Sequence, residues 1–140
     1  SLPEIIDLIQ NLMLRVKYLS VLDTIRYLVK IGRVPKSAVT EEKLRYRPMI
    51  GFVNGSGQVE NFSPVDIDNA LDKLIQQAEK YIEPGKPVHA IIHHSEYIDE
   101  AEALKEKIIS RFNPVELYVT EYSPAALAST GLMTGLSFYS

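Results

Sequence analysis

The sequence predicts an α/β fold, in the α+β-like sense, with a mixed β-sheet that contains a hairpin and is covered by helices. Three observations lead to this prediction. Short apolar runs alternate with amphipathic helical patterns, two β-rich runs flank an Asn-Gly-Ser-Gly turn, and one strand-helix-strand unit lies near the carboxyl end. The expected order is helix, strand, two helices, two strands, helix, strand, helix, strand, loop, strand.

The composition is that of one globular domain. Of the 140 residues, 46% are hydrophobic and 24% are charged, so residues 1–140 can form one core without disulfide bonds. The absence of cysteine excludes thiol redox chemistry and cysteine-ligated zinc. The net charge of −3 argues against a nucleic-acid partner, because phosphate binding requires clustered Lys and Arg. No apolar run approaches the roughly 18 residues of a membrane span, and no signal-peptide pattern opens the chain, so we expect a cytoplasmic protein.

The first quarter of the chain predicts a helix, a strand and a second helix. Residues 1–16 follow a helical pattern in which Ser1 can cap the first turn, and the apolar positions are Ile5, Leu8, Ile9, Leu12 and Val16. Residues 16–22 then predict a short strand. We expect Asp23 to cap the next helix, which Gly32 ends.

A hairpin follows in the middle of the chain. Two β-rich runs, residues 48–53 and 58–62, flank residues 54–57, which tolerate positive φ angles. These glycines predict a turn and not a phosphate-binding loop, since no helix begins directly after them. Before the hairpin, residues 36–46 predict a weaker helical turn or two, with Thr40 as a possible cap.

The second half alternates helices and strands. A long apolar stripe from Val65 to Ile82 predicts a core helix, which ends before Pro84 and Gly85. Next we expect a strand at residues 86–95, which is buried on both faces if it is central, and a helix at residues 96–112. A strand at residues 114–123 follows, with Val115, Leu117 and Val119 pointing inward. The chain then forms a loop of small residues and a last strand in the apolar tail.

The three histidines all lie on or just after one predicted strand. His89 and His93 share a face about 13 Å apart, too far to hold one metal ion, and His94 takes the other face, so we predict no metal site. The histidines can simply end a strand before a helix that Ser95 caps, or they can face a crevice at the strand ends. A hydrolase or kinase centred on His93 or His94 lacks a visible nucleophile and orienting group, and we rank it last.

Two other segments carry polar groups suited to binding. Arg33 follows the helix-ending glycine, and its guanidinium can either reach back to the free helix carbonyls or face a carboxylate or phosphate. Ser129, Thr130 and Gly131 lie in a stretch of small residues, where a ligand can approach backbone amides closely. The same composition also serves an ordinary turn.

Four segments together resemble the carboxy-terminal domain of DegV-family proteins, from about Leu2 to Tyr139: LDTIRYLVKIGRV, RPMIGFVNGSGQV, DEAEALKEKI and VTEYSPAALASTGLMTG. The family pattern has Gly-Gly-Arg after a leucine-rich helix, Lys-Pro-Ile at the hairpin, Ile-Thr-Glu on a late strand, and then His-Thr-Gly. In this chain the matching residues are 31–33, 47–49, 119–121 and 129–131. Their order along the chain carries the resemblance.

The resemblance implies a lipid-binding module and not an enzyme. Family members bind a long-chain fatty acid between two domains, and some present its carboxylate to a kinase as the acyl-carrying subunit of fatty acid kinase. By resemblance, Arg33, Ser129, Thr130 and Gly131 would contact the head group, with no cofactor or metal. The partners implied are a long-chain fatty acid, a kinase subunit, and either a second copy of the chain or the family's amino-terminal domain, which these residues do not include.

The sequence departs from the family pattern where the head group would bind. The family histidine falls at Ser129, and the segment after Gly131 is one residue short. A serine can donate a hydrogen bond, but it cannot carry the positive charge of a histidine. The alternative function is therefore an assembly or regulatory α/β domain that has lost lipid binding.

Overall fold

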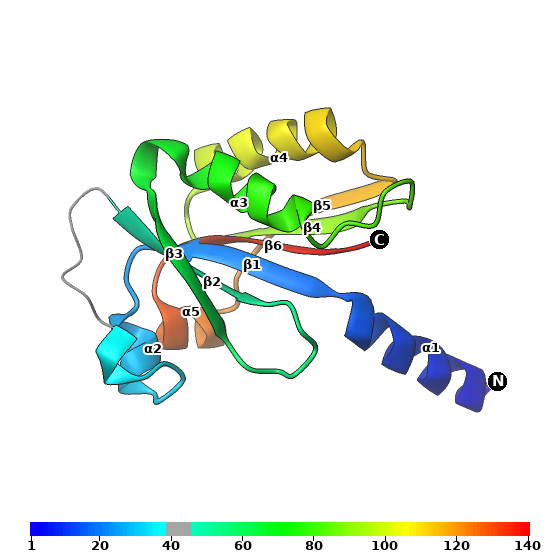
Figure 1. Cartoon of the computed structure of the whole chain (residues 1–140), viewed down its shortest axis with the longest axis horizontal. Helices are drawn as coiled ribbons and strands as arrows, with labels where there is room; N and C mark the ends of the chain where they lie inside the picture. Colours follow the sequence, from blue (N-terminus) through cyan, green and yellow to red (C-terminus); the bar gives the residue numbers. More distant parts are fainter. Residues whose placement is uncertain (39–45) are drawn as a thin grey trace.

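The computed structural model describes residues 1–38 and 46–140 (Figure 1). The helices are α1 (Leu2–Arg15), α2 (Arg26–Lys30), α3 (Ala70–Glu79), α4 (Ile98–Phe112) and α5 (Pro124–Thr130), with short 3₁₀ turns at Lys36–Ala38 and Ile67–Asn69. The strands are β1 (Lys17–Leu22), β2 (Tyr46–Phe52), β3 (Glu60–Asp66), β4 (His89–His94), β5 (Glu116–Glu121) and β6 (Met133–Tyr139).

All six strands form one sheet in the order β3-β2-β1-β6-β4-β5. Strands β2 and β3 form the predicted hairpin, and Gly55 and Gly57 in its turn have φ angles of 72° and 71°. Strands β4 and β5 are parallel and are joined through α4, whereas the other neighbouring pairs are antiparallel. The mixed sheet with a hairpin is therefore confirmed.

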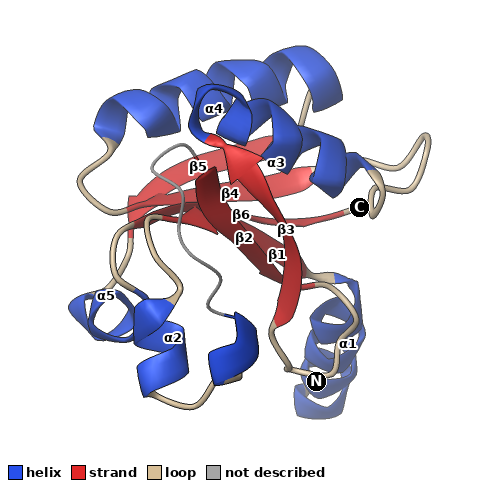
Figure 2. Cartoon of the chain, turned by 60° about the vertical axis from the view of Figure 1, so that its left-hand side comes forward, coloured by secondary structure: helices blue, strands red, loops and turns tan. Residues whose placement is uncertain are grey.

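Helices α3 and α4 cover one face of the sheet, and the main core lies beneath them (Figure 2). Leu19, Leu74, Ile92, Leu104 and Ile108 are fully buried there. The predicted stripes on these two helices are the residues that pack: Leu74 and Ile75 on α3, and Leu104 and Ile108 on α4. Burying each such side chain contributes about 1.5–3 kcal/mol, so this face fixes the register of the sheet.

A smaller second core occupies one end of the opposite face. Helices α2 and α5 lie side by side there, and Leu22, Leu28, Ile50 and Met133 are buried between them and the sheet (Figure 2). Because α2 has five residues and α5 seven, the two helices cover only part of this face.

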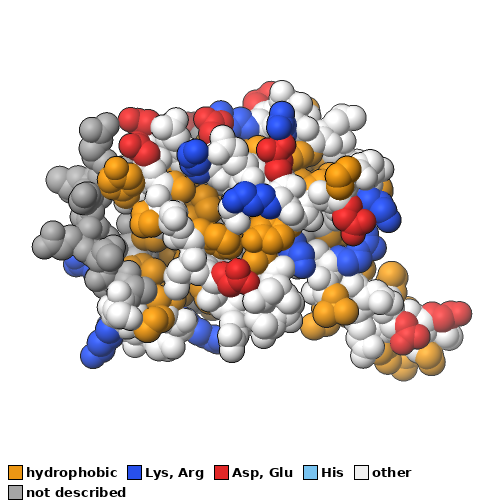
Figure 3. All heavy atoms as spheres, in the orientation of Figure 1, with side chains coloured by type: hydrophobic (Ala, Val, Ile, Leu, Met, Phe, Trp, Pro, Cys, Tyr) orange, Lys and Arg blue, Asp and Glu red, His pale blue; other side chains and the backbone are white. Residues whose placement is uncertain are grey.

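Helix α1 projects from the other end of the same face (Figures 1 and 2). Ser1 is the predicted cap and forms a capping box with Glu4, so the helix begins where expected. None of its residues is buried, however, and Ile5, Leu8 and Met13 are more than half exposed. Figure 3 shows hydrophobic side chains gathered on the surface of this projecting helix.

One predicted loop and one predicted helix start are wrong. The small-residue stretch expected as a loop forms α5, because Ser123 accepts a hydrogen bond from the amide of Ala126 and Pro124 occupies the first turn. The core helix begins at Ala70 instead of Val65, since Val65 pairs with Arg47 in the β2–β3 hairpin. Pro64 is tolerated because β3 is an edge strand.

Two predicted helix caps are also wrong. Asp23 does not cap α2; its carboxylate accepts a hydrogen bond of 2.5 Å from the Tyr97 hydroxyl, and Thr24 accepts from the amide of Arg26 instead. Ser95 does not cap α4, because its buried hydroxyl bonds to the backbone of Met133. The helical turn predicted at 36–46 lies mostly outside the described residues.

The strand at His89–His94 is buried on one face only. Ala90, Ile92 and His94 lie under α4, whereas Ile91 on the opposite face is 37% exposed. Val119 on the adjacent edge strand is also 37% exposed, so its predicted inward orientation does not bury it. No helix in the described part of the chain covers the middle of this opposite face (Figure 2).

Candidate functional site

The candidate site is the uncovered part of the sheet, which we call the open face. Strand register places a row of side chains across it, from β2 to β5: Phe52, Tyr18, Ser137, Ile91 and Tyr118. Paired residues on neighbouring strands point to the same side, so these five form one continuous surface. Four of the five are aromatic or aliphatic, and Tyr118 is 60% exposed.

An apolar groove runs between α1 and this row. Its volume is about 430 Å³, and it is lined by Ile9, Leu12, Met13, Val16, Tyr18, Phe52 and the turn glycines Gly55 and Gly57. This volume falls within the range of small-molecule sites. The exposed face of α1 therefore forms one wall of the groove, and β1 and β2 form its floor.

A second hollow of about 150 Å³ continues along the open face. Ile91, Tyr118 and Ser137 line it, and Val16 is shared with the groove. At its outer end the rings of His89 and Tyr139 stack with centroids 4.5 Å apart, and His89 faces Glu116 at 3.0 Å. The guanidinium of Arg15 lies over Tyr139 and also donates to the carbonyl of Ser140.

Four polar side chains lie between the groove and α5, and we call them the polar cluster: Tyr18, His93, Tyr122 and Ser137. The hydroxyls of Tyr18 and Tyr122 are hydrogen-bonded to each other. Nε2 of His93 lies 2.9 Å from the Ser137 hydroxyl, and its ring stacks on Tyr122 at 5.2 Å. The cluster thus joins β1, β4, β6 and the end of β5.

Burial sets the protonation of this cluster. It raises the pKa of Tyr18 and the pKa of Tyr122, so both hydroxyls keep their protons at neutral pH. Burial also lowers the pKa of His93, which favours the neutral ring. The cluster consequently offers neutral hydrogen-bonding groups and no fixed charge.

The sequence-predicted site residues lie at the α2–α5 end of the open face. The hydroxyls of Ser129 and Thr130 both donate to the carbonyl of Ala126 within α5. Gly131 has φ of 75°, and an added Cβ would lie 2.9 Å from the Tyr27 ring of α2. Helices α2 and α5 contact each other, which brings these three residues to the same helix pair as Arg33.

Arg33 itself is exposed. Its backbone amide donates to the carbonyl of Leu28, and Gly32 before it has φ of 74°, which ends α2 as predicted. Within the described residues its guanidinium has no hydrogen-bond or ion-pair partner, so it does not bind its own helix carbonyls there.

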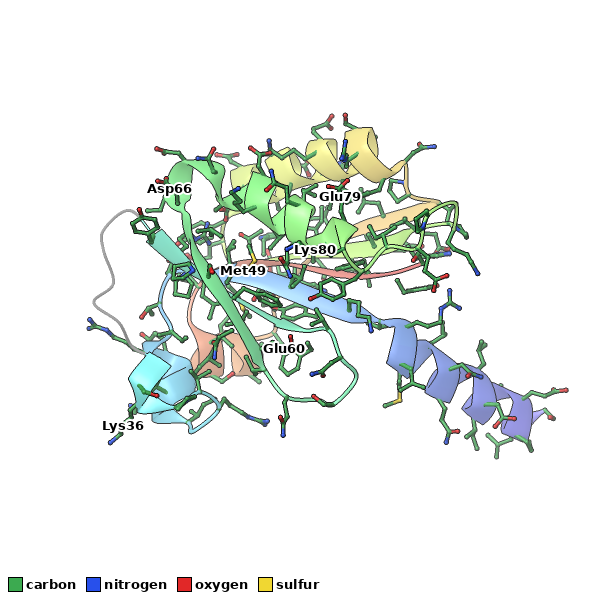
Figure 4. The ribbon with its side chains drawn as sticks, viewed as in Figure 1. Lys36, Met49, Glu60, Asp66, Glu79 and Lys80 are labelled. Carbon is green, nitrogen blue, oxygen red and sulfur yellow. The ribbon has the colours of Figure 1, made fainter. Side chains whose placement is uncertain are left out.

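A third hollow, of about 530 Å³, lies on the other side of the molecule between β3 and α3. Figure 4 shows Met49 and Lys80 close together at this place. Lys73 and Lys80 line it, but each donates to a glutamine of its own helix, at 3.1 and 2.8 Å. This hollow is more polar than the groove, which makes it a poorer candidate for an apolar ligand.

Sequence reasoning missed the polar cluster. Tyr18 and Tyr122 are 104 positions apart; Tyr122 lies in one of the four segments that carry the resemblance, but Tyr18 lies in none of them. The sequence did carry one signal for the cluster: side chains alternate between the two faces along β1 and β4, which places Tyr18 and His93 on the face opposite Leu19 and Ile92. Only the sheet order reveals that these strands flank β6.

Two features are absent from the described part of the chain. Within residues 1–38 and 46–140, no helix is both long and apolar enough to cross a bilayer. The same residues contain no group of three or more His, Asp or Glu side chains that could hold a metal ion.

The whole chain matches one family model. Residues 1–140 match the model described as "Uncharacterised protein, DegV family". Among curated proteins, the DegV domain-containing protein CPE0026 of Clostridium perfringens is 27% identical over 142 residues, which cover 99% of this chain and 48% of that protein. The chain therefore spans about half the length of this relative.

Solved structures share the fold. One is a DegV family protein from Thermus thermophilus that is reported for its fatty acid binding. Its TM-score is 0.86 at 21% sequence identity, and the match covers 100% of this chain and 51% of that one. A DegV family protein from Eubacterium eligens, loaded with heptadecanoic acid, gives 0.87 at 19% identity with the same coverage. Because the family model matches all 140 residues, the chain belongs to the DegV family.

Proposed function

We propose that this chain is a lipid-binding module that forms one half of a fatty acid site and has no catalytic activity of its own. The observation that carries this proposal is the apolar groove on the open face, bounded by α1, β1 and β2. Relatives of the same fold from Thermus thermophilus and Eubacterium eligens are described as fatty acid-binding or fatty acid-loaded, which supports the same ligand class here.

The groove suits an acyl chain because its walls are aliphatic and aromatic. Burying each methylene of the chain contributes about 0.8 kcal/mol, so a long acid can bind tightly with few polar contacts. Met13 and Leu12 on α1 and Phe52 on β2 would contact the tail.

The head group would bind near Arg33, Ser129, Thr130 and Gly131. An exposed guanidinium without a partner among the described residues can stabilise a carboxylate. Ser129 and Thr130 would need to rotate their hydroxyls away from the Ala126 carbonyl to take part. A kinase partner would then receive the carboxylate at this end of the molecule.

The other half of the site would come from elsewhere. The relatives are about twice as long as this chain, so an amino-terminal domain or a second copy would cover the open face. The alternative function, an assembly or regulatory domain without lipid, is favoured by one observation: Ser129 and Thr130 are already satisfied within α5.

Paired substitutions on α1 test the proposal. Met13 lines the groove and is 68% exposed, whereas Leu14 is 67% exposed and does not line it. Met13→Glu should weaken the binding of stearic acid about tenfold or more, because it places a carboxylate beside the acyl tail. Leu14→Glu should leave affinity within about twofold. Equal effects, or no binding of stearic acid by the unaltered protein, would contradict the proposal.

Arg33→Ala further distinguishes the lipid-binding function from the assembly or regulatory function. If Arg33 contacts the carboxylate, the variant should lose about tenfold in affinity for stearic acid, which corresponds to about 1.4 kcal/mol. Its affinity for stearyl alcohol, which has no charge, should stay the same. If the affinity for both ligands is unchanged, the head group binds elsewhere.

A further inference from the structure

The polar cluster is unusual because it interrupts an otherwise apolar ligand surface. Tyr18 belongs both to the cluster and to the lining of the groove, and Ser137 belongs both to the cluster and to the second hollow. The cluster therefore lies between the two hollows, where a ligand that fills the open face would pass over it.

The cluster has unused hydrogen-bonding capacity. Two hydroxyls that bond to each other use one hydrogen, so the Tyr18–Tyr122 pair keeps one donor. Tyr18 Oη donates to the Met133 sulfur, a weak acceptor 3.7 Å away, and the Tyr18 side chain also interacts with Ser20. His93 uses Nε2 toward Ser137, which leaves Nδ1 available. Among the described residues, one donor held by a weak acceptor and one ring nitrogen can thus turn to a ligand.

A buried neighbour adds a second sign of an incomplete polar site. Ser20 is fully buried on the same face. Its hydroxyl interacts with the Tyr18 side chain but makes no hydrogen bond of ordinary length and angle within the described residues. Buried hydroxyls are normally well bonded, because an unpaired one has lost its hydrogen bonds to water.

Gly135 lies beneath the cluster and gives it room. An added Cβ there would overlap the Tyr122 hydroxyl and would lie 3.0 Å from the Tyr18 hydroxyl and 3.1 Å from Cβ of Ser20. The glycine thus allows the two tyrosine hydroxyls to meet directly over β6 beside Ser20.

We infer that the polar cluster is a hydrogen-bonding subsite for an oxygen atom of the bound acid, either its carboxyl group or a hydroxyl group on the chain. The inference rests on the proposed function. A plain hydrocarbon segment placed over the cluster would cut its spare donor off from water without replacing the bond, whereas an oxygen atom would accept that bond. The subsite consists of other residues than those of α2 and α5 proposed above for the head group, so a carboxyl group bound at the cluster would move the head group away from Arg33.

Binding of two acids of equal chain length tests this inference. Stearic acid and 12-hydroxystearic acid are titrated into the full chain, its Tyr122→Phe variant and a Tyr81→Phe control. Tyr81 packs against the main core on the covered face of the sheet, away from the groove and the cluster. Tyr122→Phe should weaken the binding of at least one acid about tenfold, as expected for a lost buried hydrogen bond, and Tyr81→Phe should weaken the binding of neither.

The pattern of losses identifies the oxygen. Equal loss for both acids assigns the carboxyl group to the cluster, and loss for the hydroxy acid alone assigns the chain hydroxyl. If Tyr122→Phe binds both acids like the unaltered protein, the inference is overturned while the proposed function stands. If the unaltered protein binds neither acid, the proposed function fails as well.

A second variant covers the case in which Tyr122→Phe does not fold. Ser137→Ala removes the hydrogen-bond partner of His93 without altering an aromatic ring. It should weaken the binding of the same acid that the cluster contacts. Circular dichroism melting curves of each variant show whether the fold is retained. A folded Ser137→Ala that binds both acids normally would also overturn the inference.

Discussion

At the scale of single residues, the strongest polar constraint outside the open face is the ion-pair network of Arg47. Its guanidinium is buried and is hydrogen-bonded to Glu100 and to the carbonyl of Val21. Asp23 lies 3.6 Å from the guanidinium, and the hydroxyl of Thr134 donates to Glu100. This network ties β1, β2 and β6 to the first turn of α4.

Glu100→Ala should destabilise the protein by about 3 kcal/mol in urea denaturation. The substitution leaves the buried Arg47 charge with Asp23 as its remaining acidic neighbour, and breaking a buried pair is costly because the other charge stays uncompensated. Alanine is a good helix former, so loss of α4 propensity is not the cause. Lys107→Ala, which breaks an exposed pair with Asp72, should cost less than about 1 kcal/mol. Similar costs for the two variants would contradict this account.

His93 should make stability depend on pH. Burial lowers its pKa below the ordinary 6.5, so the unfolded chain takes up a proton at a higher pH than the native protein does. The free energy of unfolding should therefore fall as the pH is lowered through 6.5, until the native ring is itself protonated.

His93→Gln isolates this effect. The variant shares every other titrating group, including the His89–Glu116 pair, so its stability should fall less between pH 7 and pH 5 than that of the unaltered protein. Urea midpoints at several pH values give both curves. Parallel curves would show that His93 titrates as it does in an unfolded chain.

At the scale of elements, local signals predicted which segments form helices and strands better than where those segments end. The hairpin and α4 follow directly from their turn glycines and apolar stripe. Pairing in the sheet decided the start of α3, because Val65 pairs with Arg47 across the hairpin although its spacing fits a helix. Ser95 shows the same competition: contact with Met133 across the chain replaced a local cap.

Helix α5 depends on its cap. Ser123→Ala removes the acceptor for the Ala126 amide, which lies 3.3 Å away, and should destabilise the helix by about 1 kcal/mol. Because α5 has only seven residues, hydrogen exchange should speed up within residues 124–130 before the rest of the sheet is affected. Ser129→Ala is the matched control, since its hydroxyl only returns to a carbonyl of the same helix, and it should be nearly neutral. Equal acceleration in both variants would exclude the capping explanation.

At the scale of the whole molecule, the sequence predicted a sheet covered by helices but not the contrast between its two faces. The apolar runs in residues 86–95 and 1–16 suggest burial. In the structure β4 has one open face and α1 has no buried residue, because α2 and α5 cover only one end of that side. Which apolar side chains stay exposed depends on the sizes of the covering helices, and this information is spread over the whole chain.

An acid that binds the open face must stabilise the whole fold by mass action. A ligand present at about 100 times its dissociation constant adds about 2.7 kcal/mol, which for a domain of this size raises the melting temperature by roughly 8 °C. Because the chain has no tryptophan, far-UV circular dichroism is the appropriate probe. Met13→Glu should melt like the unaltered protein without stearic acid and should gain less on its addition. A melting temperature that falls as monomeric stearic acid is added would mean that the acid prefers the unfolded chain, and that the groove is not its site.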